Sequence, residues 1–340
     1  MPAPQEIVLD LLYARWRGQT AHAGAELGVF DAVDWVPRPA AEIARQLGLD
    51  AALALRLLRA LGALGLLDEH AGGRFAMTEA GELLRADHAE SLRDALLLRE
   101  GPEHRAIWKH LPAMIRDGRQ DGFVREFGMP GFDYAASHPA YRKAFDAGMT
   151  SQSRLQTGWT MAALQGADVD AIEHLCDVGG GHGHLLAHLL QRHPHMNGTV
   201  LEQPGVLPGG RVPWAERLGV ADRCAAASGD MFEDVPAADA YIMKLVLHDW
   251  DDETCIRILQ RQHARARSPG RVFIVEQVLP ESGAPDFAYL YDLHMLCWGS
   301  GRERTESEYA DLLRHANWSH VATWLAPNGA LAVVEGAKRT

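Results

Sequence analysis

Residues 176–190 read CDVGGGHGHLLAHLL, and this stretch decides how the rest of the chain is interpreted. The run that ends in Cys-Asp-Val has the character of a strand, and the leucine-rich run after Gly183 has that of a helix. Between the two stand glycines at 179, 180, 181 and 183. Because each glycine costs backbone entropy, four of them indicate a turn where a ligand lies against bare main chain.

The glycine spacing argues against a standard dinucleotide loop. Started at Gly179, the pattern G-x-G-x-x-G would need glycine at the position of His184. What stands there is D-x-G-x-G-x-G, which begins at Asp177 and carries Gly180 as an additional glycine. Nineteen residues past the last glycine, Glu202 ends the next strand-like run, where a carboxylate can accept hydrogen bonds from both ribose hydroxyls. Together these features indicate a ribose-bearing ligand without an obligatory pyrophosphate; a tight turn without a ligand is the alternative.

From about residue 171 onward, strand-like and helix-like runs alternate. Apolar, β-rich runs separated by helices predict an α/β fold with a doubly wound, Rossmann-like parallel sheet covered on both faces. Near the C-terminus, two strand-like runs flank Asn328-Gly329, a dipeptide suited to a tight hairpin. An antiparallel pair at the end of a parallel sheet is typical of the methyltransferase variant of this fold. The predicted strands are HLCDVG, GTVLEQ, AAASGD, ADAYIMKLVL and GRVFIVEQV, and the helices between them include HLLAHLLQRH and DETCIRILQRQHARA.

Residues 1–100 read almost entirely as short helices. A hairpin is predicted between Leu66–Asp68 and Arg74–Met77 across the Gly72-Gly73 turn, and Thr78 can cap the helix that follows. Helices followed by a small hairpin describe a winged helix. From their apolar spacing, the predicted helices cover residues 7–16, 21–27, 40–47 and 53–64.

A winged helix raises a DNA-binding hypothesis, which would require a basic recognition helix. From Arg38 to Glu100 the chain has eight basic and ten acidic residues, so the charge has the wrong sign. The leucine- and alanine-rich surface predicts instead a face buried against a second copy, which makes this region a dimerisation domain of a homodimer.

The length of 340 residues favours two domains, which we place at 1–100 and 101–340, with a helical segment at 101–165 that would form the substrate pocket. The formal net charge of -12 opposes binding to nucleic acid or to anionic membranes. Charged residues interrupt both the N-terminus and the most apolar region, so we predict neither a signal peptide nor a membrane segment. The four cysteines lie far apart without a C-x-x-C pair, which fits a reducing cytoplasm and indicates neither disulfides nor a zinc site.

Motifs spread over nearly the whole chain resemble those of one family. The chain is similar to the S-adenosylmethionine-dependent O-methyltransferases of the plant caffeic acid type and to their actinomycete counterparts, which act on antibiotics and pigments. The resemblance implies S-adenosylmethionine as the cofactor and a small hydroxylated aromatic compound as the substrate. The motifs, in the family's order and rough spacing, are AELGVFDAV, DVGGGHG, VLEQPGV, GDMF, MKLVLHDWDDE, FIVEQVLP and GRERT.

The same resemblance implies the residues of the site. It implies that His248 in the HDW motif is the general base and that Glu276 and Glu303 hold or orient it. The chain order supports two of these residues, because His248 follows one buried strand and Glu276 ends another, so both reach the ligand edge of the sheet. The positions that the resemblance implies for holding the cofactor are Gly179, Glu202, Asp230, Met231 and Lys244.

Candidate walls of the acceptor pocket are apolar and aromatic side chains, for which a place in the core is the alternative. A divalent metal site is an alternative interpretation of three nearby aspartates, Asp249, Asp251 and Asp252. Capping of the helix that follows explains these residues better, so no metal is predicted. The candidate wall residues are Trp108, Phe127, Met149, Met295 and Trp298, with the methionines favoured because the family uses them there.

The sequence departs from the plant pattern at two places. Glu202 and Gln203 replace the first two residues of the plant DLP motif, and the segment MLCWGSG does not match the plant acceptor-facing pattern, so no plant substrate is inferred.

Three functions stay open. The favoured one is an O-methyltransferase. The second is a cofactor-binding family member that hydroxylates or decarboxylates a polyketide-like ring, against which the His–Glu pair argues. The third is a winged-helix regulator, which the acidic balance disfavours.

Overall fold

The computed structural model describes residues 3–283 and 285–339, and the chain divides into two compact units. The N-terminal unit extends to Ala106 and includes Ala135–Gln152. The C-terminal unit contains Ile107–Tyr134 and the chain from Ser153 onward. Helix α11 (Pro139–Ala163) belongs partly to each unit, so the segment 101–165 is divided between them.

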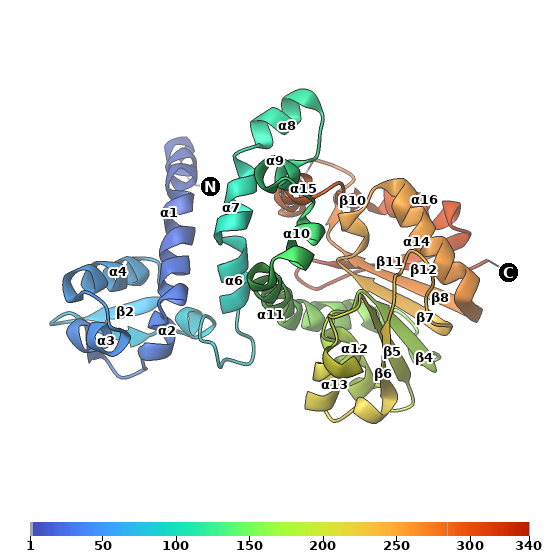
Figure 1. The fold of residues 1–340 in the computed structure, drawn as a ribbon, viewed down its shortest axis with the longest axis horizontal. Coiled ribbons are helices and arrows are strands. Elements are labelled where there is room, and N and C mark those ends of the chain that lie inside the picture. Colours follow the sequence, from blue (N-terminus) through green and yellow to red (C-terminus); the bar gives the residue numbers. More distant parts are fainter. Residues whose placement is uncertain (1–2, 284, 340) are drawn as a thin grey trace. The chain divides into compact units, whose positions relative to one another are not determined.

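Short helices and a three-stranded sheet make up the N-terminal unit (Figure 1). The predicted hairpin is present, since β2 (Leu67–His70) and β3 (Arg74–Met77) pair antiparallel. The hydroxyl of Thr78 accepts the N–H of Gly81 at 3.0 Å and caps the next helix, as predicted. Strand β1 (Arg38–Pro39) adds a third strand that was not predicted. The helices are α1 (Pro4–Glu26), α2 (Val29–Ala32), α3 (Ala40–Leu47), α4 (Ala51–Ala63), α5 (Glu79–Glu82) and α6 (Arg93–Arg99), together with the part of α7 (Pro102–Trp108) up to Ala106.

One prediction for this unit was wrong, because the two helices predicted at 7–16 and 21–27 are parts of the single helix α1, which ends at Glu26. Gly18 interrupts the apolar spacing but does not end the helix. A Cβ on Gly18 would lie 2.7 Å from the side-chain carboxyl carbon of Glu100, and the neighbouring Gln19 donates to the Glu100 main-chain oxygen at 3.1 Å. These long-range contacts outweigh the helix-propensity cost of glycine, which is about 1 kcal/mol.

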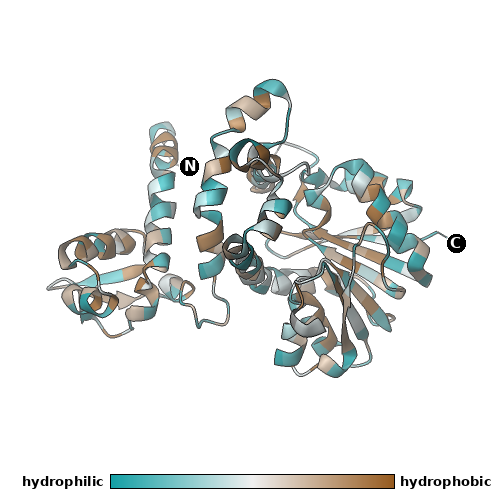
Figure 2. Cartoon of the chain, viewed as in Figure 1, coloured by the Kyte–Doolittle hydropathy of each residue, from teal (hydrophilic) through white to brown (hydrophobic). Residues whose placement is uncertain are grey.

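The N-terminal half of α1 exposes large apolar side chains, which appear as hydrophobic bands in Figure 2. Leu11, Leu12 and Trp16 are 71%, 62% and 62% exposed. A contiguous apolar surface of this kind marks an interaction site on a protein. This surface lies on α1, outside residues 38–100, the region whose leucine- and alanine-rich helix predicts a face buried against a second copy.

A seven-stranded sheet forms the centre of the C-terminal unit, in the order β11-β12-β8-β7-β4-β5-β6. Strands β4 to β8 pair in parallel, whereas β12 pairs antiparallel with both β8 and β11. Gly329 in the turn between β11 and β12 has a φ of +69°. The predicted doubly wound α/β sheet with a terminal antiparallel hairpin is therefore confirmed. The strands are β4 (His174–Val178), β5 (Asn197–Glu202), β6 (Cys224–Ser228), β7 (Ala238–Lys244), β8 (Ala266–Glu276), β11 (Trp318–Leu325) and β12 (Ala332–Lys338).

Helices cover both faces of this sheet, because successive side chains along a strand point to opposite faces. Phe273 and Ile274, which are neighbours on β8, belong to different apolar clusters. Helix α12 (His184–Arg192) contributes leucines to the cluster with Phe273, and α14 (Asp252–Arg265) and α16 (Glu306–His315) contribute to the other. In Figure 2 the strands are largely hydrophobic, while α14 and α16 show alternating hydrophobic and hydrophilic bands, as expected for helices with one solvent-exposed side.

Shorter elements complete this unit. None of the helices in the described part of the chain is both long and apolar enough to cross a lipid bilayer. Two short strands, β9 (Val278–Leu279) and β10 (Arg304–Thr305), pair in parallel with Arg304 opposite Val278. The other helices are α8 (Leu111–Asp117), α9 (Gly122–Phe127), α10 (Gly131–Ser137), α13 (Pro213–Arg217) and α15 (Ala288–Trp298), with 3-10 turns at Leu164–Gly166, Pro208–Gly210, Ala221–Arg223 and Leu247–Asp249.

Three neighbouring strands end at the same edge of the sheet. Strand β7 lies between β4 and β8, with Asp177 opposite Ile242 and Lys244 opposite Val275. The glycine loop follows β4, Lys244 ends β7 and Glu276 ends β8. The carboxyl ends of parallel strands are where α/β proteins bind ligands.

Candidate active site

The glycine loop between β4 and α12 forms the first part of the site. Gly179, Gly181 and Gly183 have φ angles of +71°, +57° and +78°, in the left-handed region that side chains disfavour. A Cβ at Gly183 would lie 2.2 Å from Cγ1 of Val212, whereas one at Gly181 would meet nothing within 4 Å. The loop therefore leaves open space beside its main chain at Gly181 and is tightly packed at Gly183.

Gly180, which the pattern leaves as an additional glycine, packs against Asp177. A Cβ at Gly180 would lie 2.5 Å from the carboxylate of Asp177, which is 1% exposed. Burial raises the pKa of Asp177 to about 7, although the nearby Lys244 opposes this shift. Burial also lowers the pKa of Lys244 to about 8, whereas the nearby Asp177 and Glu276 act to raise it. Lys244 donates to the side chain of Gln156 at 3.2 Å and interacts electrostatically with both carboxyl groups.

Glu202 ends β5 beside the glycine loop. Its Oε1 accepts the N–H of Gly181 at 2.9 Å, and its main-chain oxygen accepts the N–H of Gly229 at 3.0 Å. The second bond brings the loop after β6 to the same edge of the sheet. In that loop Asp230 is exposed and Met231 is half-buried against the core. The structure therefore gathers the predicted cofactor positions at one sheet edge, as the spacing of the motifs required.

The glycine loop also touches the turn that carries His248. A Cβ at Gly179 would lie 3.0 Å from Cγ2 of Val246, two residues before the histidine. Leu245, between the end of β7 and this turn, has a φ of +55°. A residue other than glycine adopts this conformation only when the surrounding structure holds it there.

The imidazole of His248 is buried between two carboxyl groups. Its Nδ1 lies 2.7 Å from Oε1 of Glu303 and 3.4 Å from Oε2 of Glu276, and its Nε2 lies 3.8 Å from Oδ1 of Asp249. A neutral imidazole that donates its Nδ1–H to a carboxylate presents the lone pair of Nε2 as a proton acceptor. The structure thus brings together all three residues for which a role in proton transfer was predicted, although 55 positions separate His248 from Glu303.

Glu276 also shapes the backbone of the turn. Its Oε1 accepts the main-chain N–H groups of Val246, Leu247 and His248 at 3.1, 2.9 and 3.3 Å. Burial raises the pKa of Glu276 to about 7, while the neighbouring His248 opposes the shift. Burial, followed by the charge of Asp292, raises the pKa of Glu303 well above its ordinary value. Ionising both carboxyl groups in this enclosed place is costly, so they hold protons at higher pH than exposed carboxyl groups do.

The raised pKa of Glu276 predicts how the stability of the protein depends on pH. Between its ordinary value of 4.5 and about 7, the folded state holds a proton on Glu276 that the unfolded chain has lost. This contribution to the free energy of unfolding is full below pH 4.5 and is lost as the pH rises through 7. Relative to Glu276→Gln, which cannot ionise, the wild type should lose up to about 3 kcal/mol between roughly pH 5 and pH 8.

Denaturant unfolding at one protein concentration measures this difference. The matched control is Glu281→Gln, because the main-chain N–H of Ser307 lowers the pKa of the exposed Glu281, so its pH effect should have the opposite sign. Parallel pH profiles for the wild type and Glu276→Gln would contradict the prediction.

The three aspartates near His248 have separate roles. Asp251 accepts the N–H of Thr254 at 2.8 Å and caps α14, as predicted. Asp252 forms ion pairs with two arginines from the GRERT motif, and Asp249 lies beside the histidine ring. A different set, His248 with Glu276 and Glu303, has potential metal-ligating atoms within 4.8 Å of one another. Hydrogen bonds from the ring and from the turn to these two carboxyl groups account for that arrangement.

Aromatic rings connect His248 to one predicted wall residue. The ring of Tyr291 stacks on His248 at 5.9 Å between centroids, and His294 lies 5.9 Å from Tyr291 and 6.2 Å from Trp108. Tyr291 and His294 come from α15 and were not predicted as site residues. The only indication of them in the sequence was the apolar run DLHMLCWGSG and the residues next to it. The sequence does not show that these side chains face His248, because that depends on the tertiary structure.

The other predicted wall residues lie at different places. Trp298 on α15 packs edge-on against Phe123 at 4.7 Å, and Phe127 contacts the same ring at 5.0 Å. Met295 is on α15 and is 3% exposed. Met149 belongs to the part of α11 in the N-terminal unit. The C-terminal unit thus gathers four of the five predicted wall residues on or beside α15 and α9.

Comparison with known proteins identifies the family. The model of the O-methyltransferase domain matches residues 108–319, and the model of the O-methyltransferase dimerisation domain matches residues 9–87. The chain belongs to the O-methyltransferase family. It is an S-adenosylmethionine-dependent O-methyltransferase with an N-terminal dimerisation domain, as the motifs predicted.

Individual relatives of this O-methyltransferase cover nearly its whole length. A phenazine O-methyltransferase of Lysobacter antibioticus is 34% identical over 90% of this chain and 88% of its own. The structure of human N-acetylserotonin methyltransferase in complex with S-adenosylmethionine is 26% identical, with a TM-score of 0.89 over 100% of this chain and 99% of the human one. An O-methyltransferase from neocarzinostatin biosynthesis, solved with S-adenosylhomocysteine and 1,4-dihydroxy-2-naphthoic acid, is 32% identical, with a TM-score of 0.74 over 95% and 96% of the two chains.

Proposed function

We propose that this O-methyltransferase methylates a hydroxyl group of a small aromatic natural product of polyketide, peptide-antibiotic or phenolic type, with His248 as the general base. One observation carries the proposal. The buried imidazole of His248 has its Nδ1 2.7 Å from Glu303, and it lies on a turn that packs against the glycine loop. A proton acceptor is thereby placed beside the edge of the sheet where ligands of this fold bind.

The residues at the sheet edge fit the cofactor. Main chain without a neighbouring Cβ at Gly181 gives a flat approach for a nucleoside, and the half-buried carboxylate of Glu202 can accept from the ribose hydroxyls. Gly179, Asp230, Met231 and Lys244 would complete the cofactor site in the proposal. When bound, S-adenosylmethionine supplies a methyl group on a positively charged sulfur, which is already a good leaving group.

His248 would remove the proton of the acceptor hydroxyl through Nε2. A phenol with a pKa of about 10 is ionised to about one part in a thousand near pH 7, so a base that removes this deficit contributes at most about 4 kcal/mol. The carboxyl groups of Glu276 and Glu303 at Nδ1 stabilise the imidazolium that results and keep the ring in place. Positioning of the acceptor oxygen in line with the methyl group accounts for much of the remaining acceleration.

The side chains near His248 favour a flat aromatic acceptor. Tyr291 and Trp108 offer ring faces, and Met295 and Trp298 offer apolar surface on the same helix or beside it. The relative solved with 1,4-dihydroxy-2-naphthoic acid holds a hydroxylated aromatic acid, which is the class of compound proposed here.

The same proposal includes a cytoplasmic homodimer. The match to a dimerisation domain and the exposed Leu11, Leu12 and Trp16 on α1 support the homodimer. All four cysteines are among the described residues and have free thiols, which supports a reducing compartment.

The test is an activity screen with a panel of hydroxylated aromatic compounds. Purified protein is incubated with S-adenosylmethionine and each compound, and mass spectrometry follows the product. Gain of one methylene unit in mass, together with loss of one exchangeable hydroxyl, is the expected result. A product that has gained one oxygen or lost carbon dioxide would show instead that the enzyme hydroxylates or decarboxylates its ring substrate.

A further inference from the structure

The GRERT motif, residues 301–305, lies directly against the turn that carries His248. A Cβ at Gly301 would lie 1.8 Å from the main-chain oxygen of His248 and 2.4 Å from the carbonyl carbon of Asp249. Only a glycine permits this approach, since the obstacle is backbone and not a flexible side chain. The strand β10 at the end of the motif pairs with β9, two residues after Glu276, so the segment is anchored beside the strand that ends in that carboxylate.

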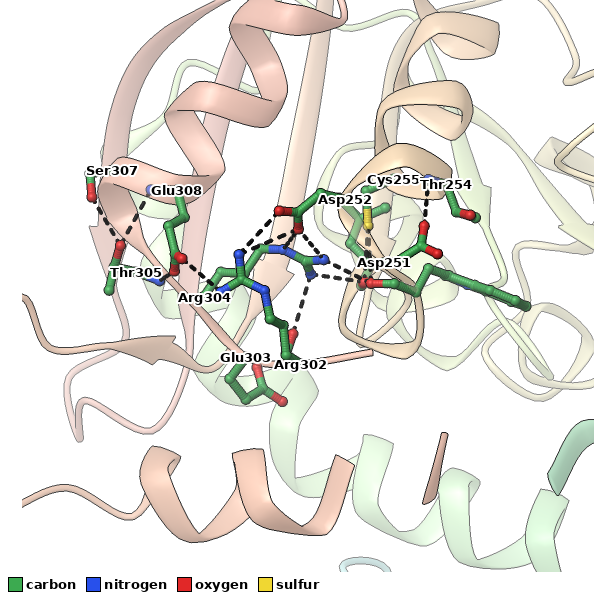
Figure 3. A network of polar contacts seen from close by, with 12 residues as sticks. Asp251, Asp252, Thr254, Cys255, Arg302, Glu303, Arg304, Thr305, Ser307 and Glu308 are labelled. Carbon is green, nitrogen blue, oxygen red and sulfur yellow. Dashed lines mark hydrogen bonds and ion pairs between the residues drawn. The ribbon is translucent and has the colours of Figure 1, made fainter. Parts of the chain in front are cut away.

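Arg304 reaches across this contact to the backbone of the turn (Figure 3). Its Nη1 donates to the main-chain oxygen of Leu247 at 3.1 Å, and its Nη2 donates to that of Trp250 at 2.7 Å. These two carbonyl groups stand on either side of His248 and Asp249. Arg304 is 0% exposed, and it therefore meets the turn from inside the protein.

The guanidinium group makes four hydrogen bonds and one further ion-pair contact with Asp252. Besides the two carbonyl groups of the turn, Nε and Nη2 face Oδ1 of Asp252 at 2.9 and 2.8 Å, and Nη1 donates to the main-chain oxygen of Arg302 at 3.2 Å. Arginine has five N–H donors in a planar fork, and five contacts are made here. A lysine has three donors on one nitrogen and cannot reach both carbonyl groups while keeping the ion pair. This satisfied geometry explains how the fold tolerates a buried charge.

Two side chains therefore hold the two sides of the same turn. A carboxyl oxygen of Glu276 accepts from its N–H groups, and the guanidinium of Arg304 donates to its carbonyl groups. The left-handed Leu245 enters this turn, so the backbone needs support from its surroundings. Glu303, the residue before Arg304, binds the ring of His248. One short segment thus contacts both the side chain and the backbone of the proposed base.

We propose that Arg304 is a positioning residue for methyl transfer, which acts by fixing the backbone of the His248 turn so that Nε2 faces the acceptor hydroxyl. This inference rests on the proposed role of His248 as the general base. The guanidinium binds main-chain oxygens and Asp252, and therefore Arg304 acts through the turn and not on the reacting atoms.

The test compares Arg304→Met, Arg304→Lys and a matched control, Arg302→Met, in the full-length protein. Arg302 lies two positions away. Its side chain pairs with Asp252 at 3.2 Å and with Glu308 at 2.7 Å, two residues outside the turn at 247–250. Each substitution is made in the wild type and in His248→Ala. Measurements are kcat, KM for the acceptor, Kd for S-adenosylhomocysteine and the melting temperature.

We expect Arg304→Met to lower kcat about 10-fold to 100-fold in the wild-type background, with Kd and KM changed less than about threefold. In the His248→Ala background the same substitution should change kcat less than about threefold, because the base that it positions is already absent. Arg302→Met should keep kcat within about twofold, and Arg304→Lys should recover part of the loss. An equal loss of kcat in both backgrounds would overturn the positioning role while leaving the proposed function intact. Unchanged kcat in His248→Ala alone would instead remove the proposed base.

A second measurement keeps the proposal testable if Arg304→Met does not fold. Hydrogen–deuterium exchange of the amides of Val246, Leu247 and His248, which Glu276 holds, should be faster in Arg304→Lys than in Arg302→Met. Equal exchange in these two variants would show that the guanidinium does not hold the turn, and it would overturn the inference.

Discussion

Replacement of His248 by alanine is expected to lower kcat by about 10²-fold to 10³-fold, because an acceptor phenol then has to lose its proton without a base. The Kd for S-adenosylhomocysteine should change less than about threefold, since the imidazole binds Glu303 and Glu276 and the glycine loop meets the His248 turn through Val246. Steady-state kinetics and calorimetry measure the two quantities separately. His315→Ala is the control, because that histidine is exposed in the last turn of α16.

The loss of kcat in His248→Ala should also depend on the pKa of the acceptor hydroxyl. Two acceptors with the same ring system but hydroxyl pKa values of about 10 and about 7 differ in how much they need a base. For the more acidic acceptor, which is already half ionised near pH 7, the loss in His248→Ala should shrink to about tenfold or less. An equal loss for both acceptors would indicate that His248 positions the substrate and does not take its proton.

Replacement of Gly183 by alanine is expected to destabilise the C-terminal unit by about 2–5 kcal/mol and to abolish measurable cofactor binding. Two costs add up. A left-handed φ of +78° costs an alanine roughly 1–2 kcal/mol, and a Cβ at 2.2 Å from Val212 forces that side chain or the loop to move, at roughly 1–3 kcal/mol. Because the loop is the surface on which the cofactor is proposed to lie, its displacement removes the binding site.

Gly181→Ala is the matched control for this substitution. Gly181 has the same kind of φ, +57°, but a Cβ there meets nothing within 4 Å, so only the conformational cost applies to stability. In Gly183→Ala combined with Val212→Ala, the steric part of the loss should be recovered. Denaturant unfolding and calorimetry with S-adenosylhomocysteine provide the measurements. Equal destabilisation by Gly181→Ala and Gly183→Ala would show that the contact with Val212 is of no energetic importance.

Local patterns predicted most of the fold of the C-terminal unit. The first seven residues of the predicted strand ADAYIMKLVL form β7, whereas its last three lie in the turn before His248. The Asn328-Gly329 turn joins β11 to β12, because strand period and turn chemistry depend on residues close together in the chain. The cap at Thr78 was predictable for the same reason, since its partner Gly81 is three residues away. The glycine loop and Glu202 were placed at one sheet edge from the rule that parallel strands end together.

Contacts between distant parts of the chain could not be read in this way. Gly18 lies inside α1 because Glu100 packs on it, and Gly180 is required because the loop folds over Asp177. The guanidinium of Arg304 binds the carbonyl group of Leu247 from 57 positions away. No local pattern predicts this hydrogen bond, although Arg304 itself belongs to the motif GRERT.

The sequence by itself therefore determined the parallel sheet, its terminal hairpin, the glycine loop and the family of this O-methyltransferase, since all of these follow from residue order and short-range chemistry. Only the tertiary structure decided that two carboxyl groups meet one ring nitrogen of His248 and that a buried arginine closes the other side of its turn. The physical reason is that directional hydrogen bonds depend on distances of a few tenths of an ångström, which packing of separate strands and helices sets and residue order does not.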